Sequence, residues 1–186
     1  MILPITLLGD KILRKKVSRV AKVDIKTIEL IKNMFETMRN ANGIGLAANQ
    51  VGADKNLFIL DISKVEGYEE IKPMVLINPK IIERSEELII FEEGCLSIPD
   101  IRADVERPES IVITYQDTDL QTHKVRAGEL LARVMQHEFD HLQGILFTDL
   151  VDDDVKKKIK KDLLNIKNRK IEIDYPVTED ADYLIK

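Results

Sequence analysis

The segment GELLARVMQHEFDHLQG, at positions 128–144, constrains the fold of this chain more than any other part of the sequence. Its apolar residues recur at intervals of three and four, the period of an α-helix with one buried face, and Gly144 stands where such a helix ends. His137 and His141 are four residues apart, so both imidazoles lie on one face of the helix. The fold must bury this helix and still let both histidines face a common point.

The same segment contains the pattern HExxH, which is typical of metal-assisted hydrolysis. His137 and His141 can bind one ion, while the carboxylate of Glu138 can reach a water on that ion without becoming a ligand. We therefore predict a hydrolase in which a metal-bound water is the nucleophile and Glu138 is the general acid and base. The competing interpretation is a partly buried helix whose histidines only form hydrogen bonds.

A tetrahedral site that keeps one position open needs a third protein ligand. A third histidine six residues after His141 is excluded, because Phe147 occupies that position. A glutamate on a later helix is another known solution, but the only glutamates after Glu138 are Glu172 and Glu179, close to the end of the chain. Neither glutamate is well placed, so the third ligand must come from elsewhere.

Cys95 is the single cysteine of the chain and cannot form an internal disulfide. A lone cysteine is commonly a small buried apolar residue, but here Gly94 permits an unusual turn beside it and Pro99 is expected to end the strand. We predict that Cys95 completes the site with His137 and His141, with one ion per chain. A thiolate ligand favours iron(II), zinc or a similar metal over magnesium or calcium.

The rest of the pattern predicts an α+β fold. Helical spacing begins after a capping Asp24 and stops at Gly43, and the glycine-rich stretch 43–52 is expected to be a loop. Short strands then cluster between the helices without regular alternation, which argues against a doubly wound sheet. We expect short, mostly antiparallel strands around a central helix that carries HExxH, and a C-terminal helix. The expected strands cover 56–62, 74–82, 87–97, 110–116 and 121–127.

The C-terminal helix is expected to begin at an aspartate cap, Asp152, and to bury one apolar stripe. Positions 155–170 hold eight Lys or Arg against one Asp, so this helix is a candidate for contact with phosphate, including ribosomal RNA. A solvated helix face is the alternative. Within 171–186 we expect an edge strand followed by a loose acidic tail. The stripe consists of Val155, Ile159, Leu163 and Ile166.

A length of 186 residues, with no repeat and no change of composition, predicts a single catalytic domain over 1–186. The net charge of −5 gives no general attraction to nucleic acid, so no specific DNA partner is expected. The N-terminus does not have the pattern of a signal peptide, and no run approaches the roughly 18 apolar residues of a membrane helix. We expect no membrane partner and a cytoplasmic location.

Three separated segments together resemble the peptide deformylases: GIGLAANQ at 43–50, EGCLS at 93–97 and QHEFDHL at 136–142. The resemblance spans nearly the whole chain. It implies removal of the formyl group from the N-terminal formyl-methionine of nascent polypeptides in a bacterial cytoplasm, with release of formate. It also implies iron(II) as the physiological metal, for which zinc, nickel or cobalt can substitute. Asn49 departs from the family pattern, which commonly has proline there.

The resemblance also assigns residues that act on the substrate. The carboxamide of Gln50 and the backbone N–H of Leu96 match the family's pair of donors to the developing oxyanion. Leu130 and Val134 share the helix face of His137 and would line an apolar pocket for methionine, although plain core packing also accounts for them. The expected substrate-binding residues are Gly43, Ile44, Gly45, Phe91, Glu93, Gly94, Leu130 and Val134.

The residues alone leave two other functions open. A zinc endopeptidase of the HExxH type would cleave internal peptide bonds, with a histidine or carboxylate as third ligand. A regulatory or structural metal module would have a closed site without a catalytic water. Formate release from formyl-methionyl peptides separates these functions.

Overall fold

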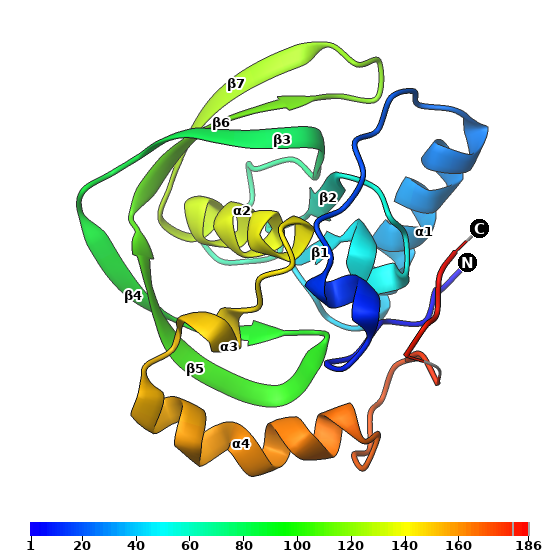
Figure 1. The fold of residues 1–186 in the computed structure, drawn as a ribbon. Helices are drawn as coiled ribbons and strands as arrows, with labels where there is room; N and C mark the ends of the chain where they lie inside the picture. Colours follow the sequence, from blue (N-terminus) through cyan, green and yellow to red (C-terminus); the bar gives the residue numbers. More distant parts are fainter. Residues whose placement is uncertain (180, 186) are drawn as a thin grey trace.

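The computed structural model describes residues 1–179 and 181–185. Helix α2 (Glu129–Leu142), which carries HExxH, lies in the middle of the molecule, with a five-stranded sheet on one side and a two-stranded hairpin on the other (Figure 1). All pairs of neighbouring strands are antiparallel. The predicted α+β class, with a central HExxH helix and a C-terminal helix, is confirmed.

The five-stranded sheet has the order β1-β2-β3-β6-β7, and strands β4 and β5 form the separate hairpin. From Ile101 to Arg107 in β5 every second residue is buried, as expected for a strand with one face on the core. β7 leads directly into α2, so the sheet fixes the start of the helix that carries both histidines. The strands are β1 Gly45–Ala47, β2 Leu57–Leu60, β3 Met74–Arg84, β4 Leu88–Cys95, β5 Ile98–Pro108, β6 Ser110–Gln116 and β7 Thr122–Gly128.

The helices begin at the caps that the sequence predicts. Asp24 accepts a hydrogen bond from the backbone N–H of Thr27 at 3.0 Å, and Asp152 accepts from Asp154 and Val155. Besides α2, the helical elements are η1 Lys11–Arg14, α1 Ile25–Asn40, η2 Ala48–Val51, α3 Phe147–Leu150 and α4 Asp153–Lys167. None of the described helices is both long and apolar enough to cross a membrane.

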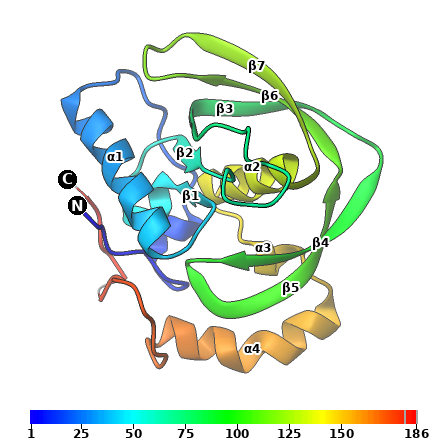
Figure 2. The ribbon, with the colours of Figure 1, turned by 180° about the vertical axis from the view of Figure 1, so that it is seen from behind.

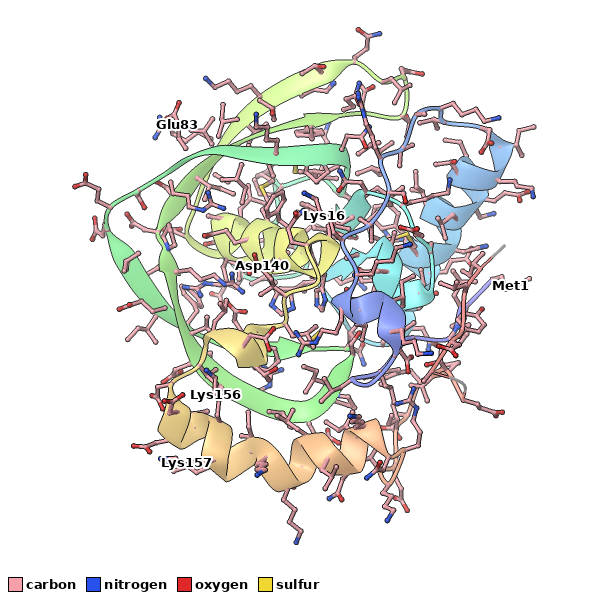
Figure 3. The ribbon with its side chains drawn as sticks, viewed as in Figure 1. Met1, Lys16, Glu83, Asp140, Lys156 and Lys157 are labelled. Atoms are coloured by element: carbon pink, nitrogen blue, oxygen red, sulfur yellow. The ribbon has the colours of Figure 1, made fainter. Side chains whose placement is uncertain are left out.

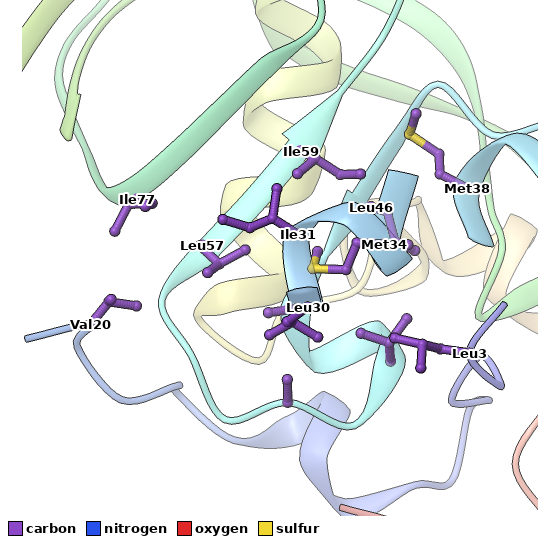
Figure 4. Close-up of a cluster of buried hydrophobic side chains, with 13 residues drawn as sticks. Leu3, Val20, Leu30, Ile31, Met34, Met38, Leu46, Leu57, Ile59 and Ile77 are labelled. Carbon is purple, nitrogen blue, oxygen red and sulfur yellow. The ribbon is translucent and has the colours of Figure 1, made fainter. Parts of the chain in front are cut away.

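The core lies in three adjoining clusters. Figure 4 shows the first, in which Met34 and Met38 of α1 pack with Leu46 and Ile59 of the sheet. A second cluster joins the sheet to the inner face of α2, and a third joins β5 to α3 and α4. A buried Leu, Ile or Met contributes about 1.5–3 kcal/mol, so the second cluster holds α2 firmly against the sheet. The predicted apolar stripe of α4 packs in the third cluster.

Two sequence expectations for the middle of the chain are wrong. The stretch 43–52 is not a plain loop, because it contains β1 and η2. The long strand β5 was not expected, since Pro99 and Pro108 are read as strand breakers. Pro99 is in fact the second residue of β5, and Pro108 is its last. Prolines near the ends of a strand of a two-stranded hairpin cost few ladder hydrogen bonds.

The expectation for the C-terminal segment is also wrong. No edge strand forms over 171–175, and the described tail is not loose. Val177 forms a parallel bridge with Ile5, and the buried Thr178 donates a hydrogen bond to Asp10 at 2.5 Å. Positions 180 and 186 lie outside the described residues. Figures 1 and 2 show the described part of the C-terminal segment running beside the N-terminal segment, so the tail packs across it.

Replacing Gly144 with alanine is expected to destabilise the fold strongly. Gly144 has a φ of +78°, and an added Cβ would lie 2.8 Å from the backbone carbonyl of Arg14. The left-handed conformation costs alanine about 1–2 kcal/mol, and the clash adds about 1–3 kcal/mol. Gly67 is the matched control, because its φ is +86° and nothing lies within 4 Å of the added atom. Urea unfolding of both variants measures the difference, and equal losses would show that the Arg14 contact is irrelevant.

Candidate metal centre

The three predicted metal ligands meet in the structure. Cys95 stands at the end of β4, and His137 and His141 project from α2. Their ligand atoms all lie within 4.8 Å of one another, and Cys95 Sγ is 3.2 Å from His141 Nε2. This is the only such group of ligands among the described residues. A thiol and two imidazoles converging at a buried point suit a transition-metal ion of the zinc or iron type.

A buried carboxylate sets the orientation of the first histidine. Glu93 Oε2 lies 2.8 Å from His137 Nδ1. When Nδ1 carries the proton and donates to this oxygen, Nε2 is left for the ion, an arrangement common around metal-binding histidines. Burial tends to lower the pKa of His137, but its hydrogen bonds to Cys95 and Glu93 outweigh burial and raise that pKa well above its usual value. For His141, burial and the neighbouring His137 lower the pKa well below its usual value.

Glu93 is itself held by two arginines. Arg107 Nε donates to Glu93 at 2.6 Å, and Arg133 donates to it at 2.8 Å. Arg107 also pairs with the partly buried Asp140, which is labelled on α2 near the centre of Figure 3. Burial tends to raise the pKa of Glu93, but the hydrogen bonds from His137 and Arg107 hold it well below its usual range. The carboxylate of Glu93 is therefore ionised and fully engaged, although the residue also lines the pocket.

Glu138 lies in the site with part of its carboxylate free. The side chain is buried, and Oε2 has no hydrogen-bond partner among the described residues. Burial raises the pKa of Glu138 to about 7. A Cβ on Gly45 would come within 2.5 Å of Glu138 Oε1, so only glycine fits beside this carboxylate. The glycine of β1 thus leaves the room that Glu138 occupies.

Gln50 and Leu96 flank the thiol. Gln50 Nε2 lies 3.5 Å from Cys95 Sγ and 3.2 Å from the hydroxyl of Ser97, while Gln50 Oε1 accepts the backbone N–H of Ala47. These contacts aim the amide N–H group of Gln50 into the site. The backbone N–H of Leu96 has no acceptor among the described residues. Gln50 and Leu96 both line the cavity beside Cys95.

A cavity of about 670 Å³ opens beside these residues. Leu130 and Val134 both line it and pack in the core cluster of α2, so the pocket and packing interpretations hold together. Phe91 is partly exposed at the cavity, with the guanidinium of Arg133 5.3 Å from its ring centroid. All eight predicted substrate-binding residues line the cavity: Gly43, Ile44, Gly45, Phe91, Glu93, Gly94, Leu130 and Val134.

Three residues near the site were not found from the sequence. Arg107 falls on the buried face of β5, and its place in the period-two pattern was the available signal. Arg133 is one of the few charged residues on the buried face of α2. Tyr175 lines the cavity and donates a hydrogen bond to the carbonyl of Leu96 at 2.7 Å. No local pattern reveals Tyr175, because its contact depends on the path of the C-terminal segment.

An HExxH helix inside an α+β fold, with a cysteine from a neighbouring hairpin in place of a third histidine or a glutamate, defines a separate class of hydrolase. This chain has that arrangement. Its residues 2–157 match the family described as polypeptide deformylase. The chain belongs to the polypeptide deformylase family, and it is an enzyme.

Individual relatives agree with this assignment. The chain is 48% identical over 179 residues to the peptide deformylase of Prosthecochloris aestuarii, with 96% of each chain covered. It is 45% identical to that of Salinibacter ruber, with 97% of this chain and 96% of the relative covered. A solved structure of Arabidopsis thaliana peptide deformylase 1B is 38% identical, with a TM-score of 0.84. The match covers 90% of this chain and 92% of that chain. The solved structure of the Thermotoga maritima peptide deformylase is 39% identical, with a TM-score of 0.76. The match covers 82% of this chain and 99% of that chain.

Proposed function

We propose that this chain removes the formyl group from the N-terminal formyl-methionine of nascent polypeptides and releases formate. The observation that carries the proposal is the meeting of Cys95, His137 and His141 beside a cavity that Glu138, Leu130 and Val134 also line. Family membership supports the same reaction. We also propose that residues 1–186 form a single catalytic domain in a bacterial cytoplasm, where nascent chains are made.

Cys95, His137 and His141 would hold one ion, with iron(II) as the physiological metal and zinc, nickel or cobalt as substitutes. When bound, such an ion lowers the pKa of a water and polarises a carbonyl. Glu138 then accepts a proton from the attacking water and passes it to the departing amine as the C–N bond breaks. A carboxyl pKa near neutrality suits a group that must both accept and release a proton.

The developing negative charge on the formyl oxygen needs fixed donors. The amide of Gln50 and the N–H of Leu96 are proposed as these donors, because both residues line the cavity beside Cys95 and are held by other contacts. The methionine side chain would occupy the part of the cavity lined by Leu130 and Val134. Gly43 and Gly45 would let the peptide backbone lie alongside β1. Such backbone pairing would accept many different residues after the methionine.

The metal-loaded chain, purified without oxygen, is expected to release formate from formyl-Met-Ala-Ser. An acetylated version of the same peptide serves as the control. A strong chelator should stop formate release, and added iron(II) or cobalt should restore it, because the proposed chemistry needs the ion. Cleavage of internal peptide bonds without formate release would favour the endopeptidase alternative. Metal binding without hydrolysis of any peptide would favour a structural metal module.

Helix α4 is proposed to contact the ribosome through its exposed lysines. Figure 3 shows Lys157 on the outer side of α4. Since the apolar stripe of α4 packs on β5, removing the helix would disturb the core, and substitution is the cleaner test. Changing Lys158, Lys160 and Lys161 to glutamine is expected to weaken co-sedimentation with ribosomes and its dependence on salt. Glutamine at three other exposed lysines, Lys26, Lys32 and Lys72, is the control. Unchanged sedimentation would contradict the contact.

A further inference from the structure

Asn49 is fully buried in η2, one residue before Gln50. Its Nδ2 donates a hydrogen bond to the backbone carbonyl of His141 at 2.5 Å, although the two residues are 92 positions apart. His141 lies in the last turn of α2, and its carbonyl also accepts the backbone N–H of Gly144 at 3.1 Å. Asn49 therefore holds the helix end that carries one of the three candidate ligands.

Two buried atoms of this residue pair have no hydrogen-bond partner in the described part of the chain: Asn49 Oδ1 and His141 Nδ1. The other ring nitrogen of His141, Nε2, is the one that lies beside Cys95 Sγ. A histidine that binds a metal through Nε2 keeps a proton on Nδ1, and that proton normally goes to an acceptor. His137 has Glu93 for this purpose, whereas His141 lacks a counterpart.

We propose that Asn49 is a positioning residue for His141. Its Nδ2 holds the carbonyl of His141, and its Oδ1 accepts the proton on His141 Nδ1 through one buried water. A single amide thus fixes both the helix end and the tautomer of the ligand. This inference rests on the proposed metal site and adds the acceptor that its second histidine requires.

Other unpartnered buried acceptors among the described residues fit this role less well. Asn56 Oδ1 belongs to a residue that lines a separate cavity, which shares no lining residue with the active-site cavity. Glu138 Oε2 is needed in the proposed reaction as a proton acceptor. Only Asn49 is already hydrogen-bonded to His141. Because an unpaired polar group is unfavourable when buried, a water that joins the two unpartnered atoms is favoured.

The variants Asn49→Ala and Asn56→Ala form a matched pair. Each removes an amide with an unpartnered carbonyl oxygen, but only the first touches His141. Competition between the metal-free chain and a chelating dye measures affinity for zinc. Asn49→Ala is expected to bind zinc about 10–100-fold more weakly than the parent, while Asn56→Ala keeps the parental affinity. Equal affinities in the parent and Asn49→Ala would overturn the proposal, and so would equal losses in the two variants.

Nitrogen-15 NMR of the zinc-loaded parent gives a second test that needs no variant. The Nδ1 proton of His141 is expected to exchange slowly with water, like that of His137 and unlike the exposed His123. In Asn49→Ala it is expected to exchange fast. Fast exchange in the parent would overturn the proposal, even if Asn49→Ala fails to fold. Zinc binding by the parent tests the metal site, and formate release tests the proposed function. A failure of the Asn49 proposal can therefore be told apart from a failure of either of these.

Discussion

Glu138→Gln is expected to lower kcat for formyl-methionyl peptides by about 10²–10⁴-fold, the range associated with loss of a general acid or base. Glutamine has the size of glutamate but cannot take up a proton at neutral pH. The substituted residue is not one of the three candidate ligands, so metal content should stay at the parental level. Formate release under saturating peptide, together with metal analysis of the same sample, measures both quantities.

Glu129→Gln is the control for this experiment. Glu129 is the first residue of the same helix and is exposed, with its carboxylate bonded to the hydroxyl of Tyr68. Its substitution should leave kcat near the parental value. If Glu138→Gln turned over as fast as Glu129→Gln while containing the full amount of metal, Glu138 could not be the proton carrier, and the proposed mechanism would be wrong.

Glu93→Gln is expected to lower the free energy of unfolding by about 3–5 kcal/mol, the usual loss when one partner of a buried ion pair is removed. The substitution leaves Arg107 and Arg133 buried without the carboxylate that both of them contact. In the variant, Asp140 can still balance the charge of Arg107, but it makes no ion pair with Arg133. Glutamine can still offer an oxygen to His137, so the measured loss reports mainly on the two arginines. Urea unfolding of the metal-free chain is the measurement.

The neighbouring residue provides the control. Glu92 is 62% exposed and lies 3.8 Å from the exposed Arg102, and an ion pair of that kind contributes between about 0 and 1 kcal/mol. Glu92→Gln should therefore change stability little. A loss in Glu93→Gln no larger than in Glu92→Gln would show that the buried cluster does not stabilise the fold.

The sequence was sufficient to predict features that depend on residues close together in the chain. HExxH places two side chains by helical geometry alone, and the absence of another suitable third ligand pointed to Cys95 before any resemblance was used. Asp24 and Asp152 were recognisable as caps because a cap bonds residues two or three positions away. These features depend on a few consecutive residues, so a single chain is enough to predict them.

Prediction failed where distant contacts override a local preference. The contacts that tie down Thr178 come from the opposite end of the chain, so its segment looked like a free tail. Glu93 lines the cavity as expected, but the sequence did not reveal that its carboxylate contacts Arg107 and Arg133, 14 and 40 positions away. Neither arginine carries a local sign of its partner. Buried ion clusters of this kind become visible only when the strands and helices are placed in space.

The hydrogen bond between Tyr175 and Leu96 has a consequence for biosynthesis. It joins residues 79 positions apart, and it holds the turn that follows Cys95. A chain emerges from the ribosome with its N-terminal part first, so this turn is made long before the tyrosine that secures it. The turn beside Cys95 therefore lacks this contact until 79 further residues have been translated, and the support for one candidate ligand is added well after the ligand itself.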